Sequence, residues 1–207
     1  MKTAKGSEPG LGKPSMGMKR TLDVLNRMEV EGVIDRYAIG GAVGAYNYIE
    51  PAVTEDPDIL VSFESSPTAP RTGLITLEPI LEHLRQKGYS EFHKEGLIIE
   101  GWAVQFLPVA NDLDAEALAQ AEDVEIRINP KEDPVKTRVL RPEHLVATAL
   151  RIGRPKDLIR ITQFLEDQAV EMRALCDVID RHDLKDAWRA FCRRAGITDP
   201  CELHFKP

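Results

Sequence analysis

The chain has 207 residues, and its 27 lysines and arginines stand against 34 aspartates and glutamates, a formal net charge of −7. Hydrophobic residues make up 43% and charged residues 29%, the ordinary mixture of a globular protein. This length predicts one domain, or a core with a small appendage. The acidic balance argues against a general nucleic-acid binder, which normally carries a basic excess, although a local basic patch is not excluded.

No apolar run reaches the ~20 residues that a membrane helix needs, and the N-terminal segment is polar, unlike a signal peptide. The three cysteines, Cys176, Cys192 and Cys201, are odd in number and widely spaced. This pattern predicts buried or free thiols in a reducing cytoplasm rather than a disulfide framework. The cysteines and histidines show no metal-ligand spacing, so a structural zinc site is not expected. We therefore expect a cytoplasmic protein that does not enter the membrane.

Three regions differ in composition along the chain. Residues 1–18 carry glycine and proline at short intervals, which predicts a disordered tail. Residues 19–140 mix helical and strand patterns, and residues 141–207 repeat their apolar positions at helix spacing only. The fold class predicted from this order is α/β or α+β, with a mixed sheet flanked by helices and a helical bundle at the C-terminal end.

The elements of the middle region can be assigned in chain order from periodicity and turn residues. The sequence predicts a helix from residue 19, a strand at 37–39, a short helix at 42–48, a strand at 58–63, a helix at 77–87, strands at 92, 97–100 and 103–109, the last two forming a hairpin, a helix at 112–122, and strands at 124–128 and 135–140. In the strand at 58–63, Ile59 and Val61 share one face while Asp58 and Leu60 share the other.

A metal and nucleotide site is predicted where the first two strands meet. Asp56 and Asp58 are two residues apart, so in an extended backbone both carboxylates leave the same face. Two carboxylates that project together favour a cation between them, and Mg²⁺ takes few carboxylates plus substrate phosphates. Gly40 and Gly41, at the start of the short helix, would let a phosphate approach the backbone closely. The competing interpretation is a plain strand-to-helix turn followed by an Asp-Pro-Asp turn.

This order of features resembles the nucleotidyltransferase superfamily, especially small bacterial members related to abortive-infection toxins and minimal nucleotidyltransferases. The resemblance spans roughly residues 37–165. Its first block matches at Ala38, Gly40, Gly41, Ala42, Thr54, Asp56, Asp58 and the strand 59–61. Its second block matches at Glu143, His144, Leu145, Arg154, Pro155, Lys156 and Asp157.

The resemblance implies Asp56 and Asp58 as catalytic metal ligands for Mg²⁺ or Mn²⁺, with an NTP as substrate. It also implies nucleotide binding at Gly40, Gly41, Thr54, Gln105, Arg154 and Lys156. Two departures stand out, because Gln105 occupies the strand position where the family has a third carboxylate, and Pro57 separates the two aspartates. Glu64 and Glu100 are the nearby acids that could replace the missing carboxylate at Gln105, and neither is well placed in sequence.

Three functions follow from these residues. The first is transfer of a nucleoside monophosphate from an NTP to an RNA, a protein or a small molecule. The second is a non-catalytic module for nucleotide or partner binding, which Gln105 and Pro57 favour. The third is the toxin-like component of a two-gene system, held in check by an antitoxin-like partner. The basic residues of segment 151–160 then form either a solvated helix face or a surface that meets phosphate or RNA. His144 is expected to pack rather than act as a base.

Overall fold

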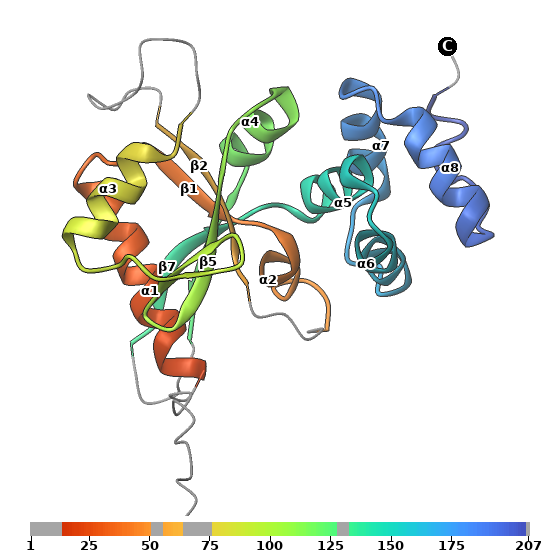
Figure 1. Ribbon diagram of the computed structural model, residues 1–207. Helices are drawn as coiled ribbons and strands as arrows, with labels where there is room; N and C mark the ends of the chain where they lie inside the picture. Colours follow the sequence, from red (N-terminus) through yellow and green to blue (C-terminus); the bar gives the residue numbers. More distant parts are fainter. Residues whose placement is uncertain (1–13, 51–55, 64–75, 128–132, 206–207) are drawn as a thin grey trace, which may run out of the picture.

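The computed structural model describes residues 14–50, 56–63, 76–127 and 133–205. Within these ranges, helices surround one open sheet (Figure 1). The elements in chain order are α1 (Pro14–Val30), β1 (Arg36–Ile39), α2 (Gly41–Ala45), β2 (Asp58–Ser62), α3 (Glu78–Gln86), β3 (Phe92–His93), β4 (Gly96–Ile99), β5 (Trp102–Pro108), α4 (Asp112–Ala119), β6 (Glu122–Ile126), β7 (Val135–Val139), α5 (Pro142–Ile152), α6 (Pro155–Glu166), α7 (Met172–Arg181) and α8 (Lys185–Ala195). No helix in the described ranges is long and apolar enough to cross a membrane.

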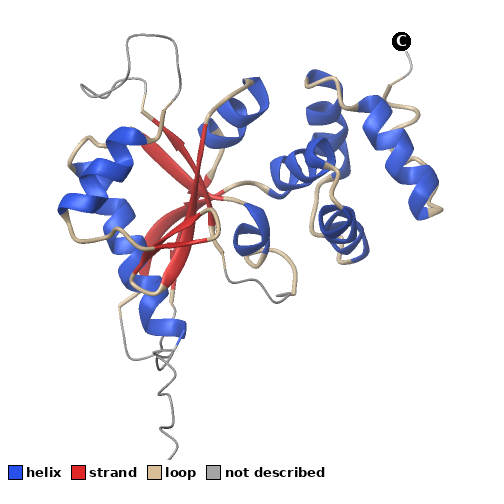
Figure 2. Ribbon diagram, viewed as in Figure 1, coloured by secondary structure: helices blue, strands red, loops and turns tan. Residues whose placement is uncertain are grey.

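The sheet is mixed. Its strand order is β3-β4-β5-β2-β1-β7-β6, in which β2 runs parallel to β5 and β1 runs parallel to β7, while the other neighbours are antiparallel. The predicted hairpin forms between β4 and β5. The predicted fold class is thus confirmed: an α/β structure with a mixed sheet flanked by helices and followed by further helices (Figure 2).

Each face of the sheet has its own hydrophobic core. On β2, Ile59 and Val61 pack with residues of α1 and α3, whereas Leu60 belongs to a second cluster with residues of α4 and α5. Figure 1 shows α1 and α3 on one side of the sheet and α2, α4 and α5 on the other. The predicted alternation along this strand is confirmed, because a strand directs successive side chains to opposite faces.

The tail predicted for residues 1–18 is wrong for its last five residues, because α1 already begins at Pro14. Proline is tolerated in the first turn of a helix, where its missing N–H would have no partner anyway. Gly17 packs so tightly on the β4–β5 turn that an added Cβ would lie 2.6 Å from the Glu100 carbonyl oxygen. One helical turn later, the Thr21 hydroxyl donates a hydrogen bond to the Ile99 carbonyl at 2.9 Å, which also holds α1 against the end of β4. Residues 1–13 lie outside the described ranges.

The helix predicted at 112–122 ends earlier than expected, at Ala119. Asn111 caps its start by accepting a hydrogen bond from the Asp114 backbone N–H at 3.1 Å. Glu122 instead belongs to β6, where it pairs with Val139. The pairing of β6 with β7 therefore takes residues whose local pattern favours a helix.

The helices α5 to α8 form the C-terminal part of the fold around buried Trp188 and Phe164. The predicted boundary after residue 140 coincides with the gap between β7 and α5. The same hydrophobic cluster, however, contains both Leu60 of the sheet and Trp188 of α8. The division into two domains stays a prediction.

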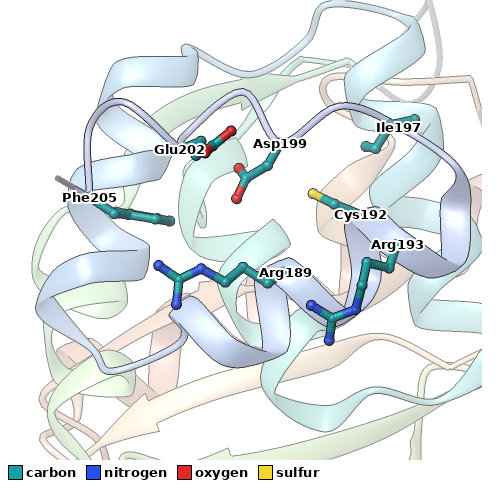
Figure 3. A pocket seen from close by; sticks show the side chains of 7 residues that line it. All are labelled: Arg189, Cys192, Arg193, Ile197, Asp199, Glu202 and Phe205. Atoms are coloured by element: carbon teal, nitrogen blue, oxygen red, sulfur yellow. The ribbon is translucent and has the colours of Figure 1, made fainter.

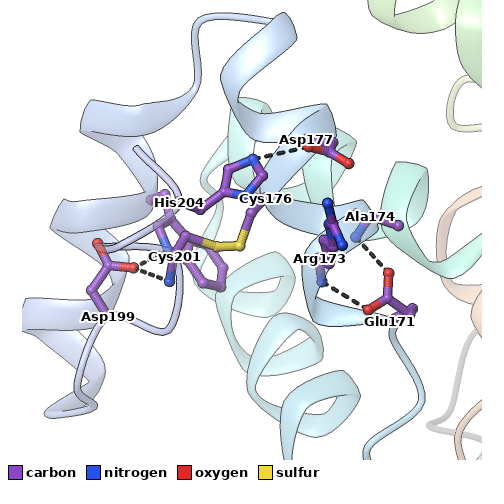
Figure 4. Close-up of a disulfide and its surroundings, with 9 residues drawn as sticks. Glu171, Arg173, Ala174, Cys176, Asp177, Asp199, Cys201 and His204 are labelled. Carbon is purple, nitrogen blue, oxygen red and sulfur yellow. Dashed lines mark hydrogen bonds and ion pairs between the residues drawn. A yellow bond between two sulfur atoms is a disulfide. The ribbon is translucent and has the colours of Figure 1, made fainter. Parts of the chain in front are cut away.

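The expectation of free thiols is wrong for two of the three cysteines, because Cys176 of α7 forms a disulfide with Cys201 (Figure 4). The segment after α8 turns back towards α7, and the Asp199 carboxylate holds this turn by accepting from the Trp188 indole N–H at 2.7 Å and the Cys201 N–H at 2.9 Å. Wide spacing in sequence gives no sign of such a return. Cys192 stays free and buried.

Candidate functional site

Asp58 and Gln105 lie side by side, as the sequence analysis predicts. They are register partners on the parallel strands β2 and β5. Their side chains lie on the same face of the sheet as those of Leu60 and Leu107. The Gln105 N–H donates to the Pro57 carbonyl at 3.0 Å, so β5 continues its pairing past the start of β2. Pro57 itself precedes the strand, a place where a missing backbone donor is tolerated.

The glycines are fitted to Asp58. The Gly40 N–H donates to the Asp58 carbonyl at 2.8 Å, and Gly41 follows with a φ of +56°. A Cβ on Gly41 would lie 1.8 Å from Oδ2 of Asp58. Only glycine therefore lets the backbone pass against this carboxylate in a left-handed conformation. The two glycines and Asp58 form one local unit, as predicted.

Asp56 presents one engaged and one unengaged oxygen. Its Oδ2 lies 3.8 Å from the Lys94 ammonium nitrogen, whereas its Oδ1 is buried with no hydrogen-bond partner among the described residues. A buried polar atom without a partner is uncommon in folded proteins. Asp56 therefore keeps one carboxylate oxygen that no described residue satisfies.

The N-terminal end of α6 brings positive charge to the same place. Arg154 donates to the buried Asp157 carboxylate at 2.6 and 3.2 Å, and Arg160 also contacts it. Burial raises the pKa of the Asp58 carboxyl, while the charges of Arg154, Arg160 and then Lys156 act in the opposite direction. The predicted residues Arg154 and Lys156 are therefore close enough to act on Asp58, and a local ion pair between Arg154 and Asp157 exists as well.

The β3–β4 turn also reaches the site, which the sequence analysis missed. His93 pairs with Gly96, so Lys94 and Glu95 form a two-residue turn, with Lys94 at a φ of +53°. The Gln105 amide nitrogen donates to Oε2 of Glu95 at 3.0 Å. The one available signal was a pair of charged residues directly before a glycine that opens a strand.

The other acids considered from sequence lie elsewhere or cannot be placed. Glu100 accepts a hydrogen bond from the Tyr89 hydroxyl at 2.7 Å and lies 3.6 Å from Arg20. Glu64 and the predicted nucleotide-binding residue Thr54 lie outside the described residues. In the described part of the chain, no group of three or more His, Cys, Asp or Glu side chains could hold a metal ion. Among the described residues, Glu100 therefore adds no carboxylate beside Asp58.

His144 is buried at the junction of α4, α5 and α7. Its Nε2 lies 3.2 Å from the Glu116 carboxylate, which also binds Arg181 and His182. Burial lowers the pKa of the His144 imidazole, although Glu116 acts in the opposite direction. The contacts of His144 are thus those of a packing residue that links helices.

A separate cavity of about 420 Å³ lies in the C-terminal helices (Figure 3). Arg189 and Arg193 line it together with Cys192, Asp199 and Phe205, and none of the predicted site residues does. Burial raises the pKa of the Cys192 thiol to about 11, so the reactive thiolate is scarce at neutral pH. Asp199 is already bonded to Trp188 and Cys201. The cavity therefore presents neither a reactive thiol nor an unengaged Asp199 carboxylate.

Comparison with known proteins gives little beyond this geometry. No protein family matches the chain, and no curated protein matches it. Among solved structures, the solution structure of the antibiotic-resistance factor ANT(2'')-Ia is similar, at 15% identity and a TM-score of 0.42 over 88% of this chain and 95% of that chain. A likeness at this identity and TM-score does not locate a functional site.

Proposed function

We propose that this protein is a metal-dependent nucleotidyltransferase that moves a nucleoside monophosphate from an NTP to an acceptor hydroxyl. The observation that carries the proposal is the surroundings of Asp58: Gly41 packs directly on its carboxylate, and the basic residues of α6 act on it. A carboxylate beside a glycine turn and several cations suits a ligand that is both metal-bound and rich in phosphate.

The residues fit a bound Mg²⁺ or Mn²⁺. The buried Oδ1 of Asp56 has no hydrogen-bond partner among the described residues, and Asp58 begins the strand two residues later. Mg²⁺ is usually held by one or two carboxylates together with substrate phosphates, so two aspartates suffice. We propose that Asp56 and Asp58 hold it; the bound metal would polarise the α-phosphate and neutralise charge on the leaving pyrophosphate.

The remaining predicted residues would position the nucleotide. We assign Arg154 and Lys156 to the phosphates, since both already lie within electrostatic reach of Asp58. Gly40 and Gly41 leave the approach to Asp58 free of side chains, and Thr54 and Gln105 complete the proposed nucleotide-binding set. An RNA or protein acceptor and an antitoxin-like partner belong to the same proposal.

A second candidate is a catalytically degenerate module that binds a nucleotide or a partner without transferring anything. Gln105 favours it, because an amide beside Asp58 supplies neither charge nor a proton acceptor. The two candidates share the nucleotide site and differ only in turnover. They are separated by measuring binding and transfer on the same protein.

The test combines both measurements. We expect NTP with Mg²⁺ to raise the melting temperature by mass action, and α-labelled NTP with Mg²⁺ or Mn²⁺ to label total RNA or total protein. Asp56→Asn with Asp58→Asn should abolish both effects without unfolding the protein. The exposed pair Asp183→Asn with Asp186→Asn is the matched control and should change neither. A full nucleotide-dependent shift in the site variant would show that the site assignment is wrong, and a shift without labelling would favour the degenerate module.

A further inference from the structure

We propose that Glu95, on the β3–β4 turn, accepts the proton of the attacking hydroxyl in the transfer reaction. The inference rests on the proposed function and assigns it a residue that the sequence motifs do not contain. Its starting point is the 3.0 Å hydrogen bond that the Gln105 amide donates to Glu95. Gln105 itself lies directly opposite Asp58 on the neighbouring strand.

The turn is built to hold Glu95 in this place. Both turn residues contact the site: Lys94 forms an ion pair with Asp56, and Glu95 accepts a hydrogen bond from Gln105. Gly96 follows at once, and a Cβ there would lie 2.7 Å from the Ala103 backbone, so the hairpin packs tightly on β5. The turn is therefore attached to the sheet on both sides of Glu95.

Glu95 lies near Asp58 through Gln105, which donates to Glu95 and pairs with Asp58 across β2 and β5. Arg154 has its pKa raised first by its hydrogen bond to Asp157, and the charges of Asp58 and Glu95 add to the effect. One guanidinium thus lies within reach of both carboxylates. Arg154 is bonded to Asp157, and the acids of the turn and of β2 both act on it through their charges.

The other polar groups at the site are committed or unsuited to this role. Asp56 and Asp58 are assigned to the metal, and Asp157 is buried between Arg154 and Arg160. Gln105 cannot accept a proton at neutral pH, since an amide is not a base there. Glu95 is exposed, so it can return a proton to solvent after each turnover.

The step balances without another reactant. The hydroxyl proton of the acceptor passes to the Glu95 carboxylate while the acceptor oxygen attacks the α-phosphorus. A new O–P bond forms, and the bond from the α-phosphorus to the bridging oxygen breaks. The electron pair of that bond leaves with pyrophosphate, and the protonated Glu95 then releases its proton to water.

The first experiment compares Glu95→Gln with Glu91→Gln, an exposed acid just before the same hairpin. We expect Glu95→Gln to slow label transfer by about 10²–10⁴-fold, the usual contribution of a positioned general base. The KM for NTP and the NTP–Mg²⁺ shift in melting temperature should stay as in the unmodified protein, because binding does not need this proton transfer. Glu91→Gln should transfer label at the unmodified rate, and so should His93→Gln, which tests the one histidine on the hairpin.

A second variant separates chemistry from structure. Glu95→Gln with Gln105→Glu exchanges the two groups, so that the turn amide donates to the strand carboxylate and the hydrogen bond is kept. We expect this exchange to recover transfer to about tenfold above Glu95→Gln alone, since general-base catalysis depends on a carboxylate within reach of the proton. Recovery supports the role of Glu95; an exchanged protein as slow as Glu95→Gln contradicts it.

Two failures can be told apart. Transfer by Glu95→Gln at the unmodified rate overturns the role of Glu95 and leaves the proposed function standing. No transfer and no nucleotide-dependent shift in the unmodified protein overturn the proposed function, and the role of Glu95 with it.

Discussion

The two faces of strand β2 serve different ends, although their residues alternate along five positions. On one face, Ile59 is 1% exposed and packs under α1 and α3, so the sheet is closed there by apolar side chains. On the other face, Leu60 is covered by α4 and α5, but Asp58 beside it meets glycine, an amide and the basic end of α6. The comparison teaches that one strand can separate stability from chemistry, residue by residue.

The largest effect should come from the closed face. We expect Ile59→Ala to lower the free energy of unfolding by about 2–5 kcal/mol, because it removes buried methyl groups and leaves a cavity. Urea denaturation measures this. Asp58→Asn, the matched change on the other face, should leave the free energy of unfolding nearly unchanged at neutral pH, since burial already disfavours the charged carboxyl. Equal losses in both variants would contradict the division between the faces.

An intermediate effect on stability should come from Glu116 of α4, which is hydrogen-bonded to Arg181, His182 and His144. Hydrogen bonds from Arg181, and then from His182 and His144, lower the pKa of the Glu116 carboxyl from 4.5 to about 2, against the effect of burial. A depressed carboxyl pKa stabilises the fold above the unfolded value and loses this contribution as pH falls towards the folded value.

We therefore expect Glu116→Gln to cost about 2 kcal/mol near neutral pH, the range for hydrogen bonds to a charged group. The difference between the two proteins should shrink as the pH falls from 4.5 towards 2, measured by denaturation at each pH. If the difference in free energy of unfolding instead grows on acidification, the histidines rather than Glu116 determine the pH dependence of this cluster.

A further effect on stability should come from Gly41. Alanine at a positive φ costs about 1–2 kcal/mol, and Gly32, at a φ of +71° with open space around it, gives the matched control Gly32→Ala. Gly41→Ala should destabilise at least as much, because the Asp58 carboxylate must also rotate away from the new Cβ. That rotation should remove the NTP–Mg²⁺ shift in melting temperature, which Gly32→Ala should keep. A retained shift in Gly41→Ala would separate Gly41 from the site.

The sequence predicts what local patterns control. The alternation in β2, the β4–β5 hairpin and the placement of Asp58 beside Gly40 all follow from short stretches of residues. The neighbourhood of Asp58 and Gln105 was expected through the resemblance, and the register confirms it. The roles of these residues stay predictions.

What the sequence does not predict depends on contacts between distant segments. Glu95 reaches the site because the tight β3–β4 turn packs against β5. The adjacent residues Lys94 and Glu95 do not by themselves predict this packing. Cys201 meets Cys176 because the chain reverses after α8. The first turns of α1 likewise pack on a distant segment, since Gly17 lies against the Glu100 carbonyl.

The two edge strands of the sheet, β3 and β6, determine how readily a second chain could pair with the sheet. At one end, β3 is only two residues long, and at the other, β6 exposes Glu122, Asp123 and Glu125. An open edge becomes a template for aggregation when it is long, flat and uncharged, and short or charged edge strands prevent this. Neither edge strand described here is both long and uncharged, so neither is a favourable template for edge-to-edge pairing.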